Sequence, residues 1–154
     1  MGQSIEKTEK KWSSYFPLID AELIRLFPKW LKEWGVYLLG GEPGIGKSTI
    51  ALQIIHQLTG LRIAYFSGEE KSDQITDRHV RIQTENAQPH SEFDIYHSNT
   101  LEDIVLTAET GEYQVVIIDS IQTISSDNLE GASGSPAQVK YCAEKIAELC
   151  KKKN

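Results

Sequence analysis

The stretch Gly41-Glu42-Pro43-Gly44-Ile45-Gly46-Lys47-Ser48-Thr49 fits the pattern G-x-x-x-x-G-K-[ST] and closely follows an apolar run, Val36 to Leu39. A buried strand, a glycine-rich loop and a helix, in that order, are typical of sites that bind nucleotide phosphates. Glycines let such a loop take positive φ angles and bring its N–H groups close to an anion. The N-terminus of the following helix favours negative charge as well. We therefore predict that residues 41–49 bind a polyphosphate.

Three side chains of this loop have specific expected tasks. Lys47 supplies a mobile positive charge for the β- and γ-phosphates, and the Ser48 hydroxyl is placed to bind Mg²⁺. Pro43 stiffens the loop and lowers the entropy lost when the loop closes around phosphate. Thr49 either assists or only packs at the helix start. ATP and Mg²⁺ are the ligands that this pattern predicts.

Length and composition limit the classes of protein to consider. The chain has 154 residues, of which 40% are hydrophobic and 25% charged, which is typical of one soluble domain or less. Its formal net charge of −6 gives no whole-chain attraction to nucleic acid. No apolar run is long enough to span a membrane and residues 1–11 are polar, so we expect neither an anchor nor a signal peptide. The expected location is the cytoplasm.

Patterns typical of strands and helices alternate along the chain. We expect strands at 36–39, 62–67, 93–96 and 113–119, and helices at 46–58, 72–82, 100–110 and 136–151. Repeated strand–helix units of this length predict an α/β fold with a doubly wound, largely parallel sheet. Residues 1–34 are expected to form a polar and amphipathic lead-in, and residues 35–154 the core.

Acidic residues follow two of the predicted strands. Ser67-Gly68-Glu69-Glu70 comes after the second strand, and Asp119 ends the fourth, almost wholly apolar one. Ligands of parallel α/β sheets bind at the carboxyl ends of the strands. An aspartate in this position is typical of a Walker B residue that holds Mg²⁺, and a further carboxylate orients and deprotonates the attacking water. A solvated acidic turn is the alternative interpretation of Glu69 and Glu70.

Several motifs together resemble the ATPase core of the RadA (Sms) family. They are GGEPGIGKST, YFSGEE followed by Gln74 and Arg78, VVIIDSIQT, and a Gly-Ser loop before Gln138-Val139-Lys140. The resemblance covers roughly residues 36 to 150 and implies a RecA-like fold of the P-loop NTPase class. It also implies a hexameric ATPase that moves on single-stranded DNA and promotes branch migration in DNA repair and recombination.

The resemblance assigns roles to individual residues. Gly41 to Ser48 would bind the triphosphate, and Ser48 and Asp119 would serve Mg²⁺. Glu69 would be the hydrolytic glutamate, with Glu70 as the fallback for that role. Gln122 would sense the state of the nucleotide.

The departures from the family pattern are equally specific. The four-cysteine zinc finger, the Lys-Asn-Arg-Phe-Gly motif and the Lon-protease-like domain are absent from this sequence. In RecA-like sheets the strand between the phosphate-loop strand and the Walker B strand comes later than the last predicted helix, so the sheet is expected to be incomplete at the C-terminus. The alternatives are a truncated remnant that binds nucleotide without turnover, and an ATPase of the DnaB or KaiC type.

Overall fold

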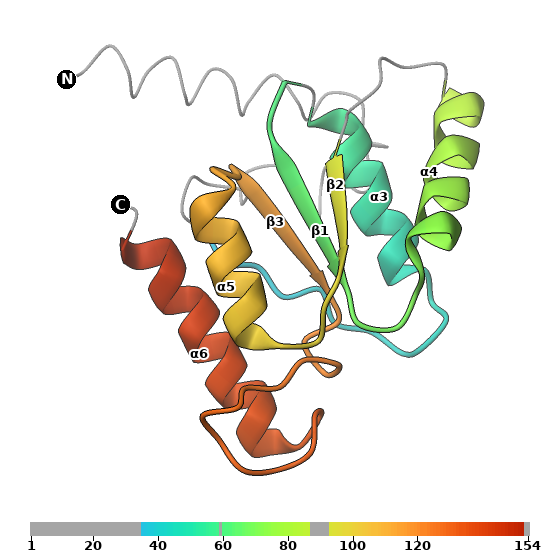
Figure 1. The fold of residues 1–154 in the computed structure, drawn as a ribbon. Helices are drawn as coiled ribbons and strands as arrows, with labels where there is room; N and C mark the ends of the chain where they lie inside the picture. The colour runs from blue at the N-terminus through green and yellow to red at the C-terminus, as the bar shows by residue number, and fades with distance from the viewer. Residues whose placement is uncertain (1–34, 59, 87–92, 153–154) are drawn as a thin grey trace, which may run out of the picture.

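The computed structural model describes residues 35–58, 60–86 and 93–152. Its centre is a three-stranded parallel sheet in the order β2-β1-β3, as Figure 1 shows. The strands are β1 (Ile63–Ser67), β2 (Phe93–His97) and β3 (Val115–Asp119). In this register Tyr65 lies opposite Ile95 on one side and Ile117 on the other, and Ser67 lies opposite Asp119. The predicted α/β fold with parallel strands is confirmed.

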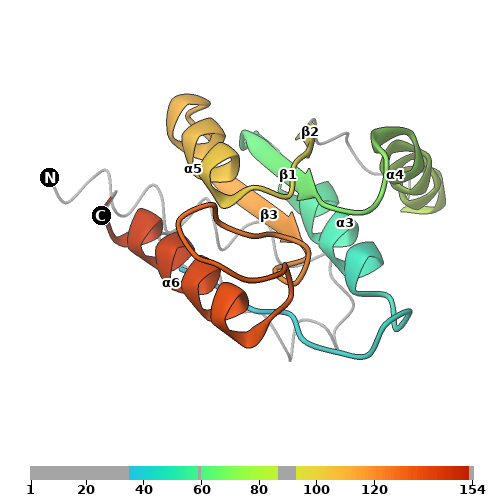
Figure 2. The same ribbon diagram turned by 60° about the horizontal axis from the view of Figure 1, so that its bottom comes forward.

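Helices cover both faces of the sheet, so the predicted double winding is also confirmed. The four described helices are α3 (Lys47–Gln57), α4 (Ser72–Asn86), α5 (Leu101–Thr110) and α6 (Pro136–Lys152). Figures 1 and 2 show α3 and α4 on one side of the strands and α5 and α6 on the other. Within each pair the helices also contact each other.

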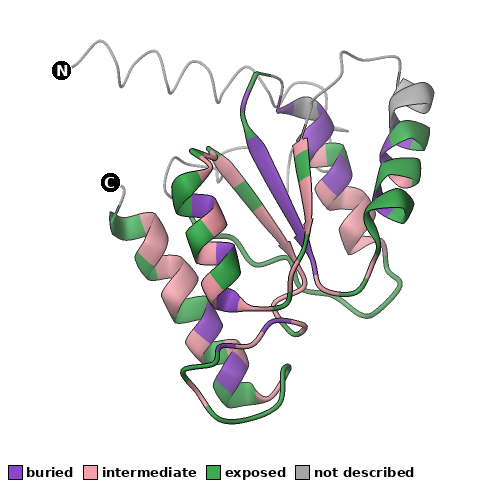
Figure 3. Ribbon diagram, in the orientation of Figure 1, coloured by how far each residue is buried: buried purple, intermediate pink, exposed green. Residues whose placement is uncertain are grey.

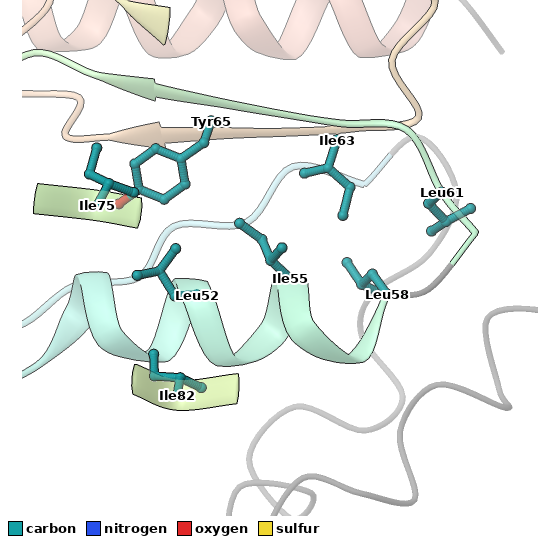
Figure 4. Close-up of a cluster of buried hydrophobic side chains, with 8 residues drawn as sticks. All are labelled: Leu52, Ile55, Leu58, Leu61, Ile63, Tyr65, Ile75 and Ile82. Atoms are coloured by element: carbon teal, nitrogen blue, oxygen red, sulfur yellow. The ribbon is translucent and has the colours of Figure 1, made fainter. Parts of the chain in front are cut away.

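The two faces of β1 divide the core into two clusters, because successive side chains of a strand point to opposite faces. Ile63 and Tyr65 pack against α3 and α4, in the cluster of Figure 4, which consists of Leu52, Ile55, Leu58, Leu61, Ile63, Tyr65, Ile75 and Ile82. Ala64 and Phe66 pack on the other face, with Leu101, Ile104, Ile124 and Cys142. Figure 3 shows that β1 is buried along its whole length, as expected of a central strand.

The predicted strand at 36–39 is wrong. Residues 35–40 have no regular secondary structure, and Leu38 is 83% exposed. A strand needs a neighbour that accepts and donates backbone hydrogen bonds. Within the described ranges the outer side of β3 pairs with no strand, and residues 35–40 form no ladder with it or with β2.

Element ends differ little from the predicted ones. The largest difference is at α4, which continues to Asn86, whereas the apolar periodicity ends at Ile82. The predicted lead-in, residues 1–34, lies outside the described residues, so the division of the chain at residue 34 stays a prediction. None of the helices in the described ranges combines the length and the apolar character that spanning a membrane requires.

Candidate phosphate and metal site

The glycine-rich loop leads directly into α3. Gly44 has φ 77° and Gly46 has φ 104°, conformations that residues with a Cβ rarely adopt. Gly46 is also the N-cap of α3, and no side chain there accepts a hydrogen bond from the first turn. The first N–H groups of a helix have no partner within the helix. The start of α3 therefore offers backbone donors to an anion.

Lys47 folds back over its own loop. Its Nζ donates hydrogen bonds to the carbonyl oxygens of Gly41 and Glu42, both at 2.7 Å. Residues 41–45 around it are exposed. The loop carbonyls therefore hold the positive charge of Lys47 beside the N-terminus of α3. An anion there would be attracted both by the lysine and by the positive end of the helix dipole.

Ser48 connects this loop to the end of β3. Its Oγ donates a hydrogen bond to Oδ2 of Asp119 at 2.5 Å, across 71 positions of sequence. A serine hydroxyl has one hydrogen to donate, so the lone pairs of Oγ remain available as acceptors. A hydroxyl oxygen beside a carboxylate is the type of donor set that Mg²⁺ prefers. The residues at this point therefore fit a magnesium ion.

Tyr65 is a member of this site that the sequence analysis missed. Its side chain is fully buried, yet its hydroxyl donates a hydrogen bond to the same Oδ2 of Asp119 at 2.6 Å. Burial, and after it the Asp119 carboxylate, raise the pKa of Tyr65 well above its ordinary value, so the hydroxyl keeps its hydrogen. A tyrosine inside an otherwise apolar strand, two residues before the strand end, was the available signal.

The turn after β1 lies against the turn after β3. The backbone N–H of Gly68 donates to the carbonyl oxygen of Asp119 at 3.2 Å. A Cβ placed on Gly68 would lie only 2.2 Å from Oγ1 of Thr123. Glycine at position 68 thus permits the close approach of the two turns, and the acidic pair and Asp119 come to the same edge of the sheet.

The two glutamates of this turn have different surroundings. Glu70 forms a bidentate ion pair with Arg78, with Nη1 2.9 Å from Oε2 and Nη2 2.5 Å from Oε1. Ser67 supports the same turn, because its Oγ accepts from the Glu70 N–H and donates to the Glu70 carbonyl. Glu69 is exposed, and within the described part of the chain no hydrogen bond or ion pair holds its carboxylate. Of the two, Glu69 has both carboxylate oxygens without a protein partner among the described residues, whereas Arg78 engages both oxygens of Glu70.

Beyond these residues, the loop before α6 has its own support. Gln138 is buried; its Oε1 accepts from the N–H of Ser126 at 3.0 Å, and its Nε2 donates to the carbonyl of Leu129 at 2.5 Å. Nothing in the sequence pattern predicted a structural task for this glutamine. Gln122, the predicted nucleotide sensor, is exposed in the turn after β3, and Thr49 lies half-buried in the first turn of α3.

Comparison with known proteins places the chain in a family. A family profile described as "AAA domain" matches residues 19–154. DNA repair protein RadA of Aquifex aeolicus is 41% identical over 120 residues, which cover 77% of this chain and 26% of the relative. For Rickettsia bellii RadA the identity is 36% over 137 residues, or 86% and 30% of the two chains. For Listeria monocytogenes RadA it is 33% over 154 residues, or 99% and 32%.

The chain thus spans between 26% and 32% of the length of these curated relatives. Its matches run through the phosphate loop, the acidic turn and the end of β3, the regions on which the sequence resemblance depends. The chain belongs to the AAA domain family, and the resemblance to the RadA family drawn from its motifs is confirmed.

Proposed function

We propose that this chain binds ATP together with Mg²⁺ and hydrolyses it as part of a RadA-type DNA repair protein. The observation that carries the proposal is the hydrogen bond from Ser48 Oγ to Asp119 Oδ2. It joins the start of α3, where phosphates are favoured, to a carboxylate at the end of β3. A phosphate loop and a metal-binding carboxylate in contact are the two parts that phosphoryl transfer requires.

In this proposal the N–H groups of the loop and of the first turn of α3 bind the phosphates. Lys47 exchanges the carbonyl oxygens of Gly41 and Glu42 for the β- and γ-phosphates, which are stronger acceptors because they are charged. Ser48 and Asp119 hold Mg²⁺. When bound, the ion neutralises charge on the phosphate oxygens.

Glu69 is the proposed catalytic base. Its carboxylate accepts a proton from the attacking water while the water oxygen bonds to the γ-phosphorus and the bond to the β–γ bridging oxygen breaks. Glu70 instead maintains the turn, because Arg78 engages both of its carboxylate oxygens. The fallback assignment of the base to Glu70 is less favoured for this reason.

Steady-state ATP hydrolysis with and without Mg²⁺ tests the proposal. Lys47→Ala and Glu69→Gln should each abolish most of the turnover, whereas Lys140→Ala, on the exposed side of α6, should leave it unchanged. Turnover that does not exceed the buffer, together with a thermal midpoint raised by Mg-ATP, would instead indicate a nucleotide-binding remnant. Neither turnover nor a raised midpoint would contradict the proposal as a whole.

Action on DNA is the second part of the proposal, and it rests on the RadA resemblance. We propose single-stranded or branched DNA as the substrate, branch migration as the reaction that ATP drives, and a homo-oligomer, a hexamer in the family, as the active form. Turnover should rise when single-stranded DNA is added, and the mass in solution should exceed that of one chain. Cytoplasmic location stays a prediction.

A further inference from the structure

Tyr65 carries an observation that the proposed function does not use. It is the central residue of β1, and its ring lies within the apolar cluster beside Leu52 and Ile75 (Figure 4). Core positions of this kind are normally filled by side chains without polar atoms. The hydroxyl nevertheless reaches out of the cluster to Asp119 Oδ2, 2.6 Å away.

The arrangement around Asp119 is asymmetric. Both described side-chain donors, the Tyr65 hydroxyl and Ser48 Oγ, donate to Oδ2, at 2.6 and 2.5 Å. Two donors on one oxygen restrict the rotation of the carboxylate about its last bond, and none of the described groups donates to Oδ1. The carboxylate is thereby oriented before any ligand arrives.

The two donors differ in their surroundings. Ser48 lies half-buried at the start of α3, next to the exposed loop, and would itself contact the metal in the proposed site. Tyr65 is fixed by the sheet, because β1 is paired on both sides and Tyr65 lies opposite Ile117, two residues before Asp119. Of the two, Tyr65 is therefore the fixed reference against which the carboxylate is aligned.

We propose that Tyr65 is a positioning residue of the magnesium site, and that its hydroxyl sets which oxygen of Asp119 faces the metal. This inference rests on the proposed function, since it needs a metal at Asp119. Hydrogen-bond partners of metal ligands fix ligand orientation in many metalloproteins. A tyrosine that only satisfies its own hydroxyl would have no effect on metal affinity.

The test is the Mg²⁺ dependence of nucleotide binding in the variant Tyr65→Phe. Affinity for a fluorescent, non-hydrolysable ATP analogue is measured over a range of Mg²⁺ concentrations, so that no turnover is needed. Phenylalanine keeps the ring and the cluster of Figure 4. The Mg²⁺ concentration at which the increase in analogue affinity is half-maximal should rise roughly tenfold. Removal of a hydrogen-bond partner of a metal ligand typically has an effect of this size. Affinity in the absence of Mg²⁺ should not change.

Tyr113→Phe is the matched control. Tyr113 also donates its hydroxyl to a carboxylate, Oδ2 of Asp94 at 2.5 Å, but at the opposite end of the sheet. This variant should keep the Mg²⁺ dependence of the wild type. A thermal melt of each variant without nucleotide shows that both are folded.

A double-mutant cycle with Asp119→Asn separates positioning from a general effect on the core. If Tyr65 acts through the carboxylate, Tyr65→Phe adds nothing to Asp119→Asn. A Mg²⁺ dependence of Tyr65→Phe within twofold of the wild type would overturn the inference and leave the proposed function standing. An equal loss of affinity with and without Mg²⁺ would overturn it too. A wild type without any Mg²⁺ enhancement would contradict the proposed function itself.

Discussion

Replacing Glu69 and Glu70 by glutamine, one at a time, should affect different properties of the protein. Glutamine keeps the size of the side chain and removes its charge and its basicity. The two positions are adjacent, so any general effect of the turn on folding is shared by both variants. The difference between them therefore measures what each carboxylate does.

For Glu70→Gln the expected loss is one of stability. The pair with Arg78 is bidentate, but the two side chains are 25% and 34% exposed, so solvent weakens the attraction. An exposed pair contributes up to about 1 kcal/mol, and glutamine keeps one acceptor for the guanidinium. We expect a loss of about 1 kcal/mol, or roughly 3 °C in thermal midpoint for a chain of this size. Turnover should fall only modestly, because the turn loosens and no reacting group is removed.

For Glu69→Gln the expected pattern is reversed. The side chain is exposed and has no partner within the described residues, so stability should change by less than about 0.5 kcal/mol. Loss of a general base lowers turnover by about 100- to 10,000-fold. The control is Glu109→Gln, an exposed position on α5, which should alter neither property.

Steady-state ATP hydrolysis and unfolding in urea, measured on the same preparations, show separately how each variant changes turnover and stability. A more than hundredfold loss of turnover in Glu70→Gln, with its stability at the wild-type value, would contradict these two assignments. That result would assign the base to Glu70 and would make the Arg78 pair part of the catalytic machinery. Equal losses of turnover in both variants would indicate that the carboxylates act together.

Three further predictions concern the packing that supports the site. Gly68→Ala should lower the free energy of unfolding in urea by about 1–3 kcal/mol, because the new Cβ would overlap the side chain of Thr123. The control is Gly40→Ala, whose Cβ would have no neighbour within 4 Å, and equal losses in the two variants would contradict the prediction. Gln138→Leu should lower the free energy of unfolding by about 2 kcal/mol, because it leaves buried backbone groups without a partner. Nucleotide affinity should stay unchanged, and a lower affinity would contradict this prediction. Leu52→Ala should lower the free energy of unfolding by about 2–5 kcal/mol because Leu52 is buried, whereas Leu38→Ala, at an exposed position, should lower it by less than about 0.5 kcal/mol. A large loss of stability in Leu38→Ala would mean that the run at 36–39 packs against the core.

Local patterns were sufficient for most of the fold. The run before Asp119 and the run Arg62 to Ser67 are both apolar and bounded by polar or glycine residues, and each contains the strand that the structure shows. Parallel pairing followed from the helices between them. Because parallel strands bring their carboxyl ends to one edge, the proximity of the acidic turn and Asp119 could be predicted without knowledge of any contact.

What could not be predicted depends on partners distant in sequence. Val36 to Leu39 has the composition of a strand, but composition does not decide whether a run pairs with a neighbouring strand, and in the structure this run joins no sheet. Tyr65 was hidden for a related reason. Its role comes from the register that sets it near Asp119, and composition alone makes it an ordinary core residue.

The predicted phosphate loop of this chain is therefore anchored to the core at its C-terminal end only. On its C-terminal side, α3 packs Leu52 and Ile55 into the core, and Ser48 is bonded to Asp119, so the first turn of the helix is fixed. On its N-terminal side, residues 36–45 are exposed and form no strand. The groups fixed in advance are the α3 N-terminus, Ser48 and the Asp119 carboxylate with its tyrosine. If the loop binds phosphate as proposed, we expect the entropy cost of binding to fall on the exposed residues 36–45 more than on Ser48 and Asp119, which are already bonded to each other.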